Sequence, residues 1–374
     1  MSKFDFFVPQ HIRNMGRYVP GKTVKQAESE SGIRSIKLAS NENPFGPSPK
    51  AIAAIQRAAS EINWYPDADS AELREKIAAK HNVPVDYVLV GAGSSSLLHV
   101  IGRTVLAPGL NAVTSECSFI TYPLVCQAAG ATLKKVPMKN LGYDLDGILA
   151  GIDGNTRVVF LANPNNPTGS CVTAGEIDRF LDRVSPHVIV VLDEAYSDFA
   201  EVFMAEQGVE YSHGIQHVLN GRNVVVLRTF SKAQGLAGTR VGYGIGDPEL
   251  MQYLTRVKVV FSVSVIAEAA ALAAMDDEAH RQKTLRNNTE GATYLTQKLT
   301  EMGFKVQPTF GNFVYVDIGE DCVEVAKLLQ NEGVIVRPLK GWGAPTALRI
   351  SIGTPEENAQ CIAAMKKVMV ATFR

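Results

Sequence analysis

The stretch TFSKAQGLAGTRVGYG, residues 229–244, carries the side chains best suited to chemistry. Lys232 follows Ser231 directly, Thr229 lies three positions before the lysine, and Arg240 lies eight positions after it. A lysine amine condenses with a carbonyl to form a Schiff base, whereas hydroxyl groups and a guanidinium bind a phosphate dianion. The stretch therefore favours a ligand with both an aldehyde and a phosphate, which describes pyridoxal 5′-phosphate (PLP). The alternative is an ordinary Ser-Lys pair at a surface turn.

Two further motifs follow apolar runs of the kind that form buried strands. ANPNNPTG (162–169) places Asn166 in a polar turn, where its amide can donate to a phenolate oxygen. VVLDEAYSDF (190–199) places Asp193 at the mouth of a strand and Tyr196 three residues later. A carboxylate there can pair with a protonated pyridine nitrogen, which makes PLP an electron sink, and the tyrosine can donate to the 3′ oxygen of the ring. An Asn-Pro turn without a ligand and a helix N-cap at Asp193 are the alternatives, but the three motifs together favour PLP.

The segment VLVGAGSSSLLHVI, residues 88–101, predicts a strand, a glycine turn and a helix. The free N–H groups and positive dipole end of a helix N-terminus can hold a phosphate. The competing interpretation is a dinucleotide fingerprint, and hence a nicotinamide oxidoreductase, because Gly91 and Gly93 fit it. Ser96 stands where the third glycine would be, so that signal is weak. A strand-turn-helix corner without a ligand is the third possibility.

The elements around these motifs alternate between apolar runs and helical stretches. Apolar runs buried on both faces and separated by helices predict an α/β domain with a mainly parallel sheet. From about Met251 onward, long helical stretches are followed by short strands, which predicts a smaller α+β domain. We therefore expect a large PLP-binding domain at 41–255, with 1–40 and 256–374 forming an N-terminal arm and the small domain. Ser48 and Pro49 predict a helix start, and Asp69 with Glu72 predicts a capping box.

Composition narrows the class of protein. The chain has 374 residues, a net charge of −1 and 46% hydrophobic residues, which suits a soluble protein with two cores. The charge balance predicts no nucleic-acid partner, and no apolar run approaches the length of a membrane span. Five scattered cysteines without a CxxC pair favour a reducing cytoplasm. His213 and His217 are four apart but lack the pattern of a metal site, so no metal is predicted.

Motifs along nearly the whole chain stand in the order known from one enzyme family. They are YVPGK, KLASNENPFGPSP, NWYPDA, ANPNNPTG, VVLDEAY, SKAQGLAGTRVGY, VIVRP and LRISIG. In these motifs the chain resembles the histidinol-phosphate aminotransferases. The resemblance implies the fold-type I architecture of PLP-dependent transferases, in which a large domain with a mainly parallel, seven-stranded sheet between helices is joined to a smaller α+β domain.

The resemblance also implies a role for individual residues. Lys232 would bind the PLP aldehyde and move the substrate proton, Asp193 would pair with the pyridinium, and Asn166 and Tyr196 would hold the 3′ oxygen. Phe119 would stack on the ring. The phosphate of the cofactor would be bound by Ser94, Ser95, Thr229, Ser231 and Arg240, and Tyr65 would reach the phosphate in the partner subunit of a homodimer. The substrate end would be lined by Arg349, Arg337, Tyr18, Tyr65 and Asn43.

The implied reaction transfers an amino group between L-histidinol phosphate and 2-oxoglutarate, giving imidazole acetol phosphate and glutamate in histidine biosynthesis. The two substrates share one pocket in turn, so ping-pong kinetics are expected. Aromatic amino acid aminotransferases and threonine-phosphate decarboxylases share most of the motifs and remain as alternatives. The chain departs from the family at Ser95 and Ser96, where an acidic pair is common. Backbone amides could still bind phosphate there.

Overall fold

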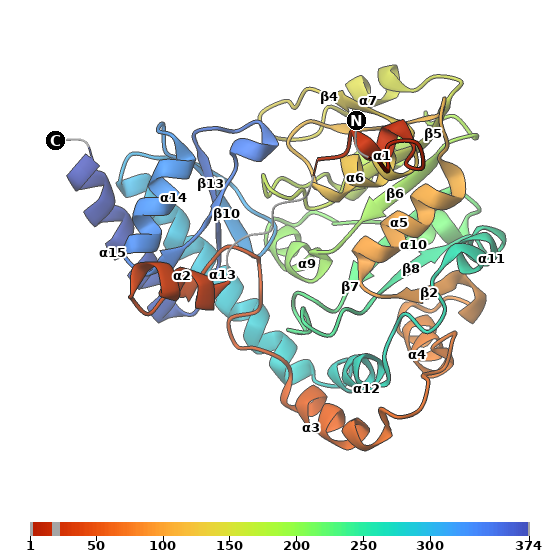
Figure 1. Ribbon diagram of the computed structural model, residues 1–374, viewed down its shortest axis with the longest axis horizontal. Coiled ribbons are helices and arrows are strands. Elements are labelled where there is room, and N and C mark those ends of the chain that lie inside the picture. Colours follow the sequence, from red (N-terminus) through yellow and green to blue (C-terminus); the bar gives the residue numbers. More distant parts are fainter. Residues whose placement is uncertain (1–2, 17–22, 373–374) are drawn as a thin grey trace.

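The computed structural model describes residues 3–16 and 23–372 and contains a larger and a smaller domain side by side (Figure 1). The larger domain is built on a seven-stranded sheet and the smaller one on a four-stranded sheet. Tyr18, which the family resemblance assigned to the substrate end, lies outside the described residues.

The large sheet has the strand order β2-β8-β7-β6-β5-β3-β4. Neighbouring strands are parallel except around β8, which runs antiparallel to both β2 and β7. The predicted fold class, with its mainly parallel sheet, is confirmed. The strands are β2 (Val88–Gly91), β3 (Asn111–Ser115), β4 (Thr132–Val136), β5 (Thr156–Ala162), β6 (Ile189–Asp193), β7 (Val224–Thr229) and β8 (Gly242–Gly246).

Helices cover both faces of this sheet, which explains why its strands read as continuous apolar runs. Along β6, for example, Val190 and Leu192 join one core while Val191 joins the core on the opposite face. Because successive side chains of a strand point to opposite faces, a sheet covered on both sides needs apolar residues at every position. The helices of this domain are α3 (Pro49–Ala58), α4 (Ala71–His81), α5 (Ser94–Val105), α6 (Thr121–Ala128), α7 (Leu145–Gly151), α8 (Ala174–Leu181), α9 (Ser197–Glu206), α10 (Gly214–Leu219), α11 (Pro248–Val257) and α12 (Val265–Ala274).

The smaller domain packs its helices on an antiparallel sheet of strand order β12-β13-β10-β9. Its strands are β9 (Lys305–Gln307), β10 (Phe313–Asp317), β12 (Arg337–Pro338) and β13 (Ala347–Ser351), and β1 (Ile36–Lys37) pairs in parallel with β11 (Val334–Ile335). Its helices are α13 (Glu278–Glu301), α14 (Cys322–Asn331) and α15 (Pro355–Thr372).

The transition between the two cores lies further along the chain than residue 256. Ala267, Ala270 and Ala271 of α12 belong to the core of the large sheet. Leu295 and Leu299, late in α13, belong to the core of the small sheet. We propose that the domain boundary falls within α13, the long helix that runs from α12 toward the smaller domain (Figure 1).

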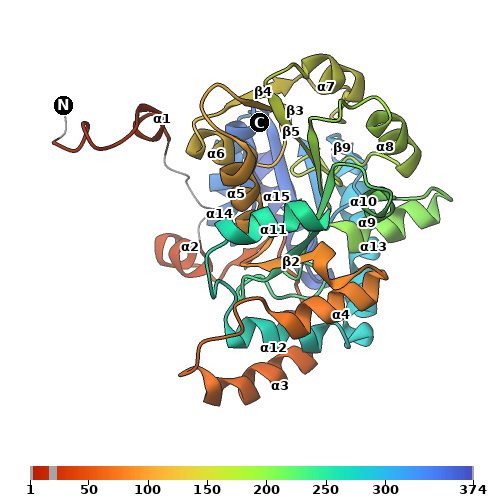
Figure 2. The same cartoon turned by 90° about the vertical axis from the view of Figure 1, so that its right-hand side faces the viewer.

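The described residues at the N-terminal side contain α1 (Gln10–Arg13) and α2 (Val24–Ser31), and α2 begins with a capping box between Thr23 and Gln26. The predicted Asp69–Glu72 capping box is wrong, because α4 starts after Ser70 and the Asp67 carboxylate accepts the bond from the Ala71 N–H. The Ser48 cap with Pro49 at N1 is confirmed. The segment that carries α1 projects from the body of the molecule (Figure 2).

No helix among residues 3–16 and 23–372 combines the length and apolarity that crossing a bilayer requires.

Candidate active site

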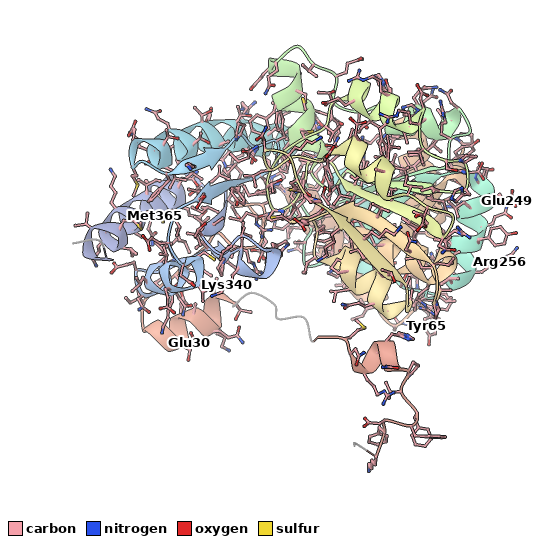
Figure 3. All side chains as sticks on the ribbon, turned by 90° about the horizontal axis from the view of Figure 1, so that it is seen from above. Glu30, Tyr65, Glu249, Arg256, Lys340 and Met365 are labelled. Atoms are coloured by element: carbon pink, nitrogen blue, oxygen red, sulfur yellow. The ribbon has the colours of Figure 1, made fainter. Side chains whose placement is uncertain are left out.

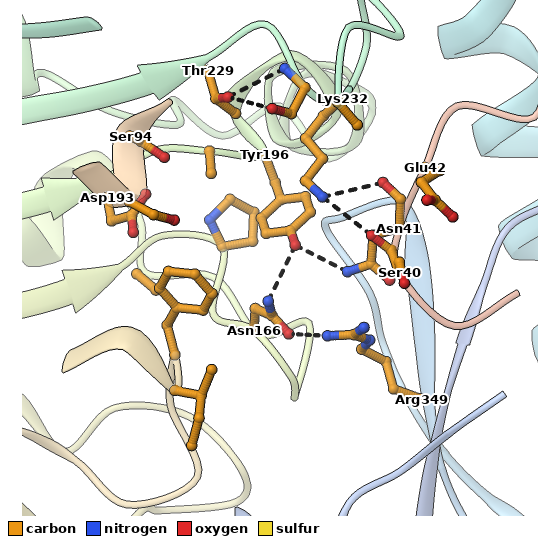
Figure 4. Close-up of a pocket in the computed structure, with 18 of the residues that line it drawn as sticks. Ser40, Asn41, Glu42, Ser94, Asn166, Asp193, Tyr196, Thr229, Lys232 and Arg349 are labelled. Carbon is orange, nitrogen blue, oxygen red and sulfur yellow. Dashed lines mark hydrogen bonds between the residues drawn. The ribbon is translucent and has the colours of Figure 1, made fainter. Parts of the chain in front are cut away.

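A cavity of about 290 Å³ lies at the carboxyl ends of β5, β6 and β7, where the smaller domain meets the larger. Open α/β sheets bind ligands at this edge. Most of the predicted site residues line it: Ser94, Ser95, Phe119, Asn166, Asp193, Tyr196, Thr229, Ser231, Lys232, Arg240, Arg337 and Arg349. Ten of the lining residues are labelled in Figure 4.

Lys232 lies just beyond the end of β7, and its amine reaches across the cavity toward the chain segment that precedes α3. Its Nζ donates to the backbone oxygens of Ser40 at 3.3 Å and Asn41 at 3.2 Å (Figure 4). Burial, with the nearby Arg349 guanidinium as a second cause, lowers the pKa of Lys232 to about 7. An amine with such a pKa is partly neutral at physiological pH, which suits both a nucleophile and a general base.

Asp193 is the last residue of β6 and is 3% exposed. It is not the N-cap of α9, since Tyr196 occupies that position. One carboxylate oxygen, Oδ2, accepts a bond from the Tyr122 hydroxyl at 3.3 Å, whereas Oδ1 is buried without a hydrogen-bond partner among the described residues. Burial raises the pKa of Asp193 to about 7. An unpaired buried carboxylate oxygen is costly, and a protonated pyridine nitrogen would satisfy it.

The turn between β2 and α5 forms the opposite end of the cavity from the smaller domain. Gly93 has a φ of +83°, and a Cβ built on it would lie 2.7 Å from Nη2 of Arg240. A residue with a side chain would be strained at this φ and would displace the guanidinium, so glycine suits the position. Arg240 Nη1 lies 3.4 Å from the Ser231 hydroxyl, to which Thr229 donates at 3.0 Å.

A guanidinium, several hydroxyls and the N-terminus of α5 thus surround one space, and this donor set fits a phosphate. Ser94 and Ser95 open α5 and line the cavity. Ser96 turns away, because its hydroxyl donates to the Gly93 oxygen at 2.9 Å. Because serines stand where the family commonly has an acidic pair, this end of the cavity is formed by neutral and basic groups.

Tyr196 lies in the middle of the cavity wall, and its hydroxyl oxygen is contacted by two amides (Figure 4). Asn41 Nδ2 donates to it at 2.9 Å and Asn166 Nδ2 at 3.2 Å. Oδ1 of Asn166 in turn accepts from Arg349 Nη1 at 2.5 Å. A contiguous chain of hydrogen bonds therefore joins Tyr196 of the larger domain to Arg349 of the smaller one.

Arg337 and Arg349 enter the cavity from neighbouring strands of the small sheet. They are direct partners in the antiparallel register of β12 and β13, so their side chains share one face. Arg349 is 5% exposed and also donates to the Ala39 oxygen at 2.7 Å. Two like charges opposite each other are unfavourable, and an anion between them would relieve the repulsion.

Two predicted site residues do not line the cavity. Asn43 donates to the backbone oxygen of Ala233 at 2.9 Å and to the Thr284 hydroxyl at 3.0 Å, and it lines a separate cavity. Tyr65 is 83% exposed at the outer edge of the larger domain (Figure 3), and its ring lies 4.9 Å from that of Phe261.

Sequence reasoning missed three residues that the structure brings to the site. Asn41 contacts Tyr196 and Lys232, Tyr122 contacts Asp193, and Trp342 lines the cavity from the smaller domain. Asn41 stands in KLASNENPFGPSP, two positions before Asn43, which was predicted at the substrate end instead. Tyr122 stands three positions after Phe119. The Tyr122 ring lies 5.7 Å from that of Phe119, which comes just before α6, so closeness in sequence is the signal that could have suggested it.

Comparison with known proteins assigns the chain to a protein family. The model of "Aminotransferase class I and II" matches residues 33–365. The chain is 44% identical to Histidinol-phosphate aminotransferase 2 of Pseudomonas aeruginosa, with 99% of both chains covered. It is also 44% identical to the histidinol-phosphate aminotransferase of Akkermansia muciniphila, over 97% of this chain and 99% of that protein.

A solved structure has the same fold. The crystal structure of histidinol-phosphate aminotransferase from Sinorhizobium meliloti, in complex with pyridoxal-5′-phosphate, superimposes with a TM-score of 0.88 at 28% identity. The match covers 99% of this chain and 98% of that one. The chain belongs to the class I and II aminotransferases. Within that class, the relatives named here are histidinol-phosphate aminotransferases, and the resemblance found in the sequence motifs is confirmed.

Proposed function

We propose that this enzyme is a PLP-dependent aminotransferase that moves an amino group between L-histidinol phosphate and 2-oxoglutarate in histidine biosynthesis. The observation that carries the substrate assignment is the arginine pair, Arg337 opposite Arg349, at the end of the cavity away from Gly93 and Arg240. The similarity to histidinol-phosphate aminotransferases supports the same assignment.

PLP, when bound, supplies a conjugated ring that takes up the electrons released when the substrate loses its α-proton. The residues present fit it at both ends. Asp193 Oδ1 would accept from the ring nitrogen, and Gly93, Ser231 and Arg240 would hold the phosphate. Asn166 and Tyr196 would donate to the 3′ oxygen, and the Phe119 ring would cover one face.

Lys232 would act as the base in the proton transfer. Its amine would take the proton from the substrate Cα and deliver it to the cofactor carbon that bears the aldehyde. A pKa of about 7 allows the amine to accept a proton and release it again in the same cycle. The backbone oxygens of Ser40 and Asn41 lie within 3.3 Å of Nζ and orient the amine.

Arg337 and Arg349 would bind the anionic end of each substrate in turn. A guanidinium presents a planar fork of donors that fits a phosphate or a carboxylate. Histidinol phosphate would offer a phosphate dianion and 2-oxoglutarate a carboxylate to the same pair. One cavity can therefore accept both substrates, as ping-pong exchange requires.

The decisive experiment is a panel of amino donors assayed with 2-oxoglutarate, including histidinol phosphate, phenylalanine and tyrosine. We expect kcat/KM to be highest for histidinol phosphate. An enzyme that ignores histidinol phosphate and converts phenylalanine would be an aromatic aminotransferase. Release of carbon dioxide from threonine phosphate would indicate the decarboxylase instead.

We further propose that the enzyme is a cytoplasmic homodimer with shared active sites. Tyr65 would reach the cofactor phosphate of the partner subunit. Its exposure supports this role, as does the exposure of its apolar neighbours Ile62, Trp64, Val259 and Val260, because such surfaces mark protein contacts. Five cysteines with free thiols support a reducing compartment.

A further inference from the structure

Asn41 is a buried loop residue that contacts both Tyr196 and Lys232 in the cavity. It is 1% exposed and has a φ of +56°, in the left-handed region that asparagine tolerates better than most residues. Its side chain donates to the Tyr196 hydroxyl at 2.9 Å, and its backbone oxygen accepts from Lys232 Nζ and from Asn312 Nδ2.

The hydrogen bonds of Asn41 fix which way its amide faces. The Ser351 hydroxyl accepts from the Asn41 backbone N–H at 2.8 Å and donates to Asn41 Oδ1 at 2.9 Å. In this arrangement the oxygen of the Ser351 hydroxyl accepts from the backbone N–H and its one proton goes to Oδ1. Nδ2 then faces Tyr196.

The second amide at Tyr196 is fixed in the same way. Asn166 Oδ1 accepts from Arg349 Nη1 at 2.5 Å, so its Nδ2 also faces the tyrosine hydroxyl. Both amides therefore donate to the Tyr196 oxygen and neither can accept from it. The hydroxyl proton of Tyr196 is directed away from both of them and is free to point into the cavity.

We propose that Asn41 is a positioning residue that, together with Asn166, forces the Tyr196 hydroxyl to act as a hydrogen-bond donor toward the 3′ oxygen of PLP. This inference rests on the proposed function, because it requires that PLP occupy the cavity. Asn41 acts through Tyr196, so it influences the electronic state of the cofactor without touching the reacting atoms.

The charged groups around Tyr196 must be considered alongside this contact. Burial raises the pKa of the Tyr196 phenol, and the field of Arg349 lowers it, as does the bond from Asn41, while Asp193 raises it. Lys232 Nζ lies 5.4 Å from the centre of the ring. A variant that tests Asn41 must therefore leave these charges unchanged.

Asn41→Gly meets this condition, since glycine adopts a positive φ readily and adds no charge. The measurement is the pH midpoint of the visible absorption band of the holoenzyme, which reports the protonation state of the bound cofactor. A donor to the 3′ oxygen stabilises its anionic form. Its weakening in Asn41→Gly should raise the midpoint by about 0.5 pH unit or more.

The same substitution in a Tyr196→Phe background tests whether Asn41 acts on the cofactor through the Tyr196 hydroxyl. Without the hydroxyl, Asn41→Gly should shift the midpoint little, since Asn41 has no proton left to direct. Asn82→Gly is the matched control, because Asn82 also has a positive φ, of +52°, but caps α4 outside the cavity. It should leave the midpoint unchanged.

An unchanged midpoint in Asn41→Gly, or an equal shift in both backgrounds, would overturn the proposal.

If Asn41→Gly fails to fold or to bind PLP, Ser351→Ala provides the test. It removes only the hydroxyl that orients the amide and should shift the midpoint in the same direction, so an unmoved midpoint in a folded Ser351→Ala holoenzyme would also overturn the idea. A wild-type protein that shows no cofactor band would instead refute the proposed function.

Discussion

The Tyr122 hydroxyl donates to Asp193 Oδ2 at 3.3 Å, and Oδ1 of the same carboxylate has no hydrogen-bond partner in the part of the chain that the structure describes. Tyr122 is fully buried and its ring stacks on Phe160, with centroids 4.8 Å apart. The phenol therefore has little freedom to move. Tyr122 stabilises the ionised carboxylate and orients it, so that its free oxygen is available to a ligand.

Tyr122→Phe should weaken PLP binding while preserving the fold. The hydrogen bond from Tyr122 opposes the rise in the pKa of Asp193 that burial causes. Without it the carboxyl group takes up a proton at a higher pH and is a poorer partner for the ring nitrogen. We expect Kd for PLP to rise by about threefold to tenfold at pH 7.5. Titration of the cofactor-free protein measures this.

Tyr243→Phe is the control for that substitution. Its hydroxyl pairs with His81 Nε2 at 2.8 Å, and its side chain is buried outside the cavity. If both substitutions change the affinity for PLP equally, Tyr122 has no specific role.

The cofactor-free protein should lose stability toward neutral pH because of Asp193 and Lys232. The pKa of Asp193 is raised to about 7, so the folded state binds the extra proton between roughly pH 4 and 7 and stability falls as pH rises through that window. The pKa of Lys232 is lowered to about 7, so the unfolded state binds the extra proton between roughly pH 7 and 10 and stability rises with pH there. The two effects together place a minimum near pH 7.

Urea unfolding of the cofactor-free protein at pH 5, 7 and 9 measures this minimum. Asp193→Asn should remove the dependence below pH 7 and Lys232→Met the dependence above it, each by about 1 kcal/mol or more. Profiles of both variants that run parallel to the wild type would show that neither group titrates as described.

Arg337→Ala should distinguish phosphate from carboxylate substrates. If both arginines face the phosphate of histidinol phosphate, the loss of one charge-assisted contact costs about 1.5–3 kcal/mol, or roughly tenfold to a hundredfold in kcat/KM. A donor without a phosphate, such as phenylalanine, should be affected much less. Equal and small losses for both donors would place Arg337 outside substrate binding.

The assembly can be tested by complementation between two inactive chains. Tyr65→Ala removes the residue that each chain would contribute to the active site of the other subunit, and Lys232→Ala removes the base. In a homodimer with shared sites, random mixing gives hybrid dimers with one intact site, so about a quarter of the wild-type activity should return. Sedimentation establishes whether the protein is a dimer, and an active monomer would refute the arrangement.

The sequence predicted the parts of the site that follow regular elements. Asp193 is the last residue of β6, and Asn166 and Lys232 lie in the turns that follow β5 and β7. The carboxyl ends of parallel strands must meet at one edge of the sheet. The sequence predicted short strands in the smaller domain, but the direct pairing of Arg337 with Arg349 depended on a register that no local pattern specifies.

The remaining contacts depend on loop conformation. Asn41 and Asn43 are two residues apart in one polar loop, and composition cannot tell which side chain reaches the cavity. The left-handed φ of Asn41 decides it, together with the bonds that hold Asn43 to Ala233 and Thr284. The start of α4 was misplaced for a similar reason, since Ser70 adopts a φ of +51° and breaks the geometry of a capping box.

Strand β13 has a consequence for how this enzyme can change its substrate. Arg349 and Ser351, two residues apart on that strand, orient the two amides that contact Tyr196. A replacement at 349 that admits a new substrate therefore also disturbs the cofactor. Arg337 makes no hydrogen bond to either amide within the described chain. The substrate preference can therefore change through substitutions at Arg337 with less disturbance of the cofactor than through substitutions at Arg349.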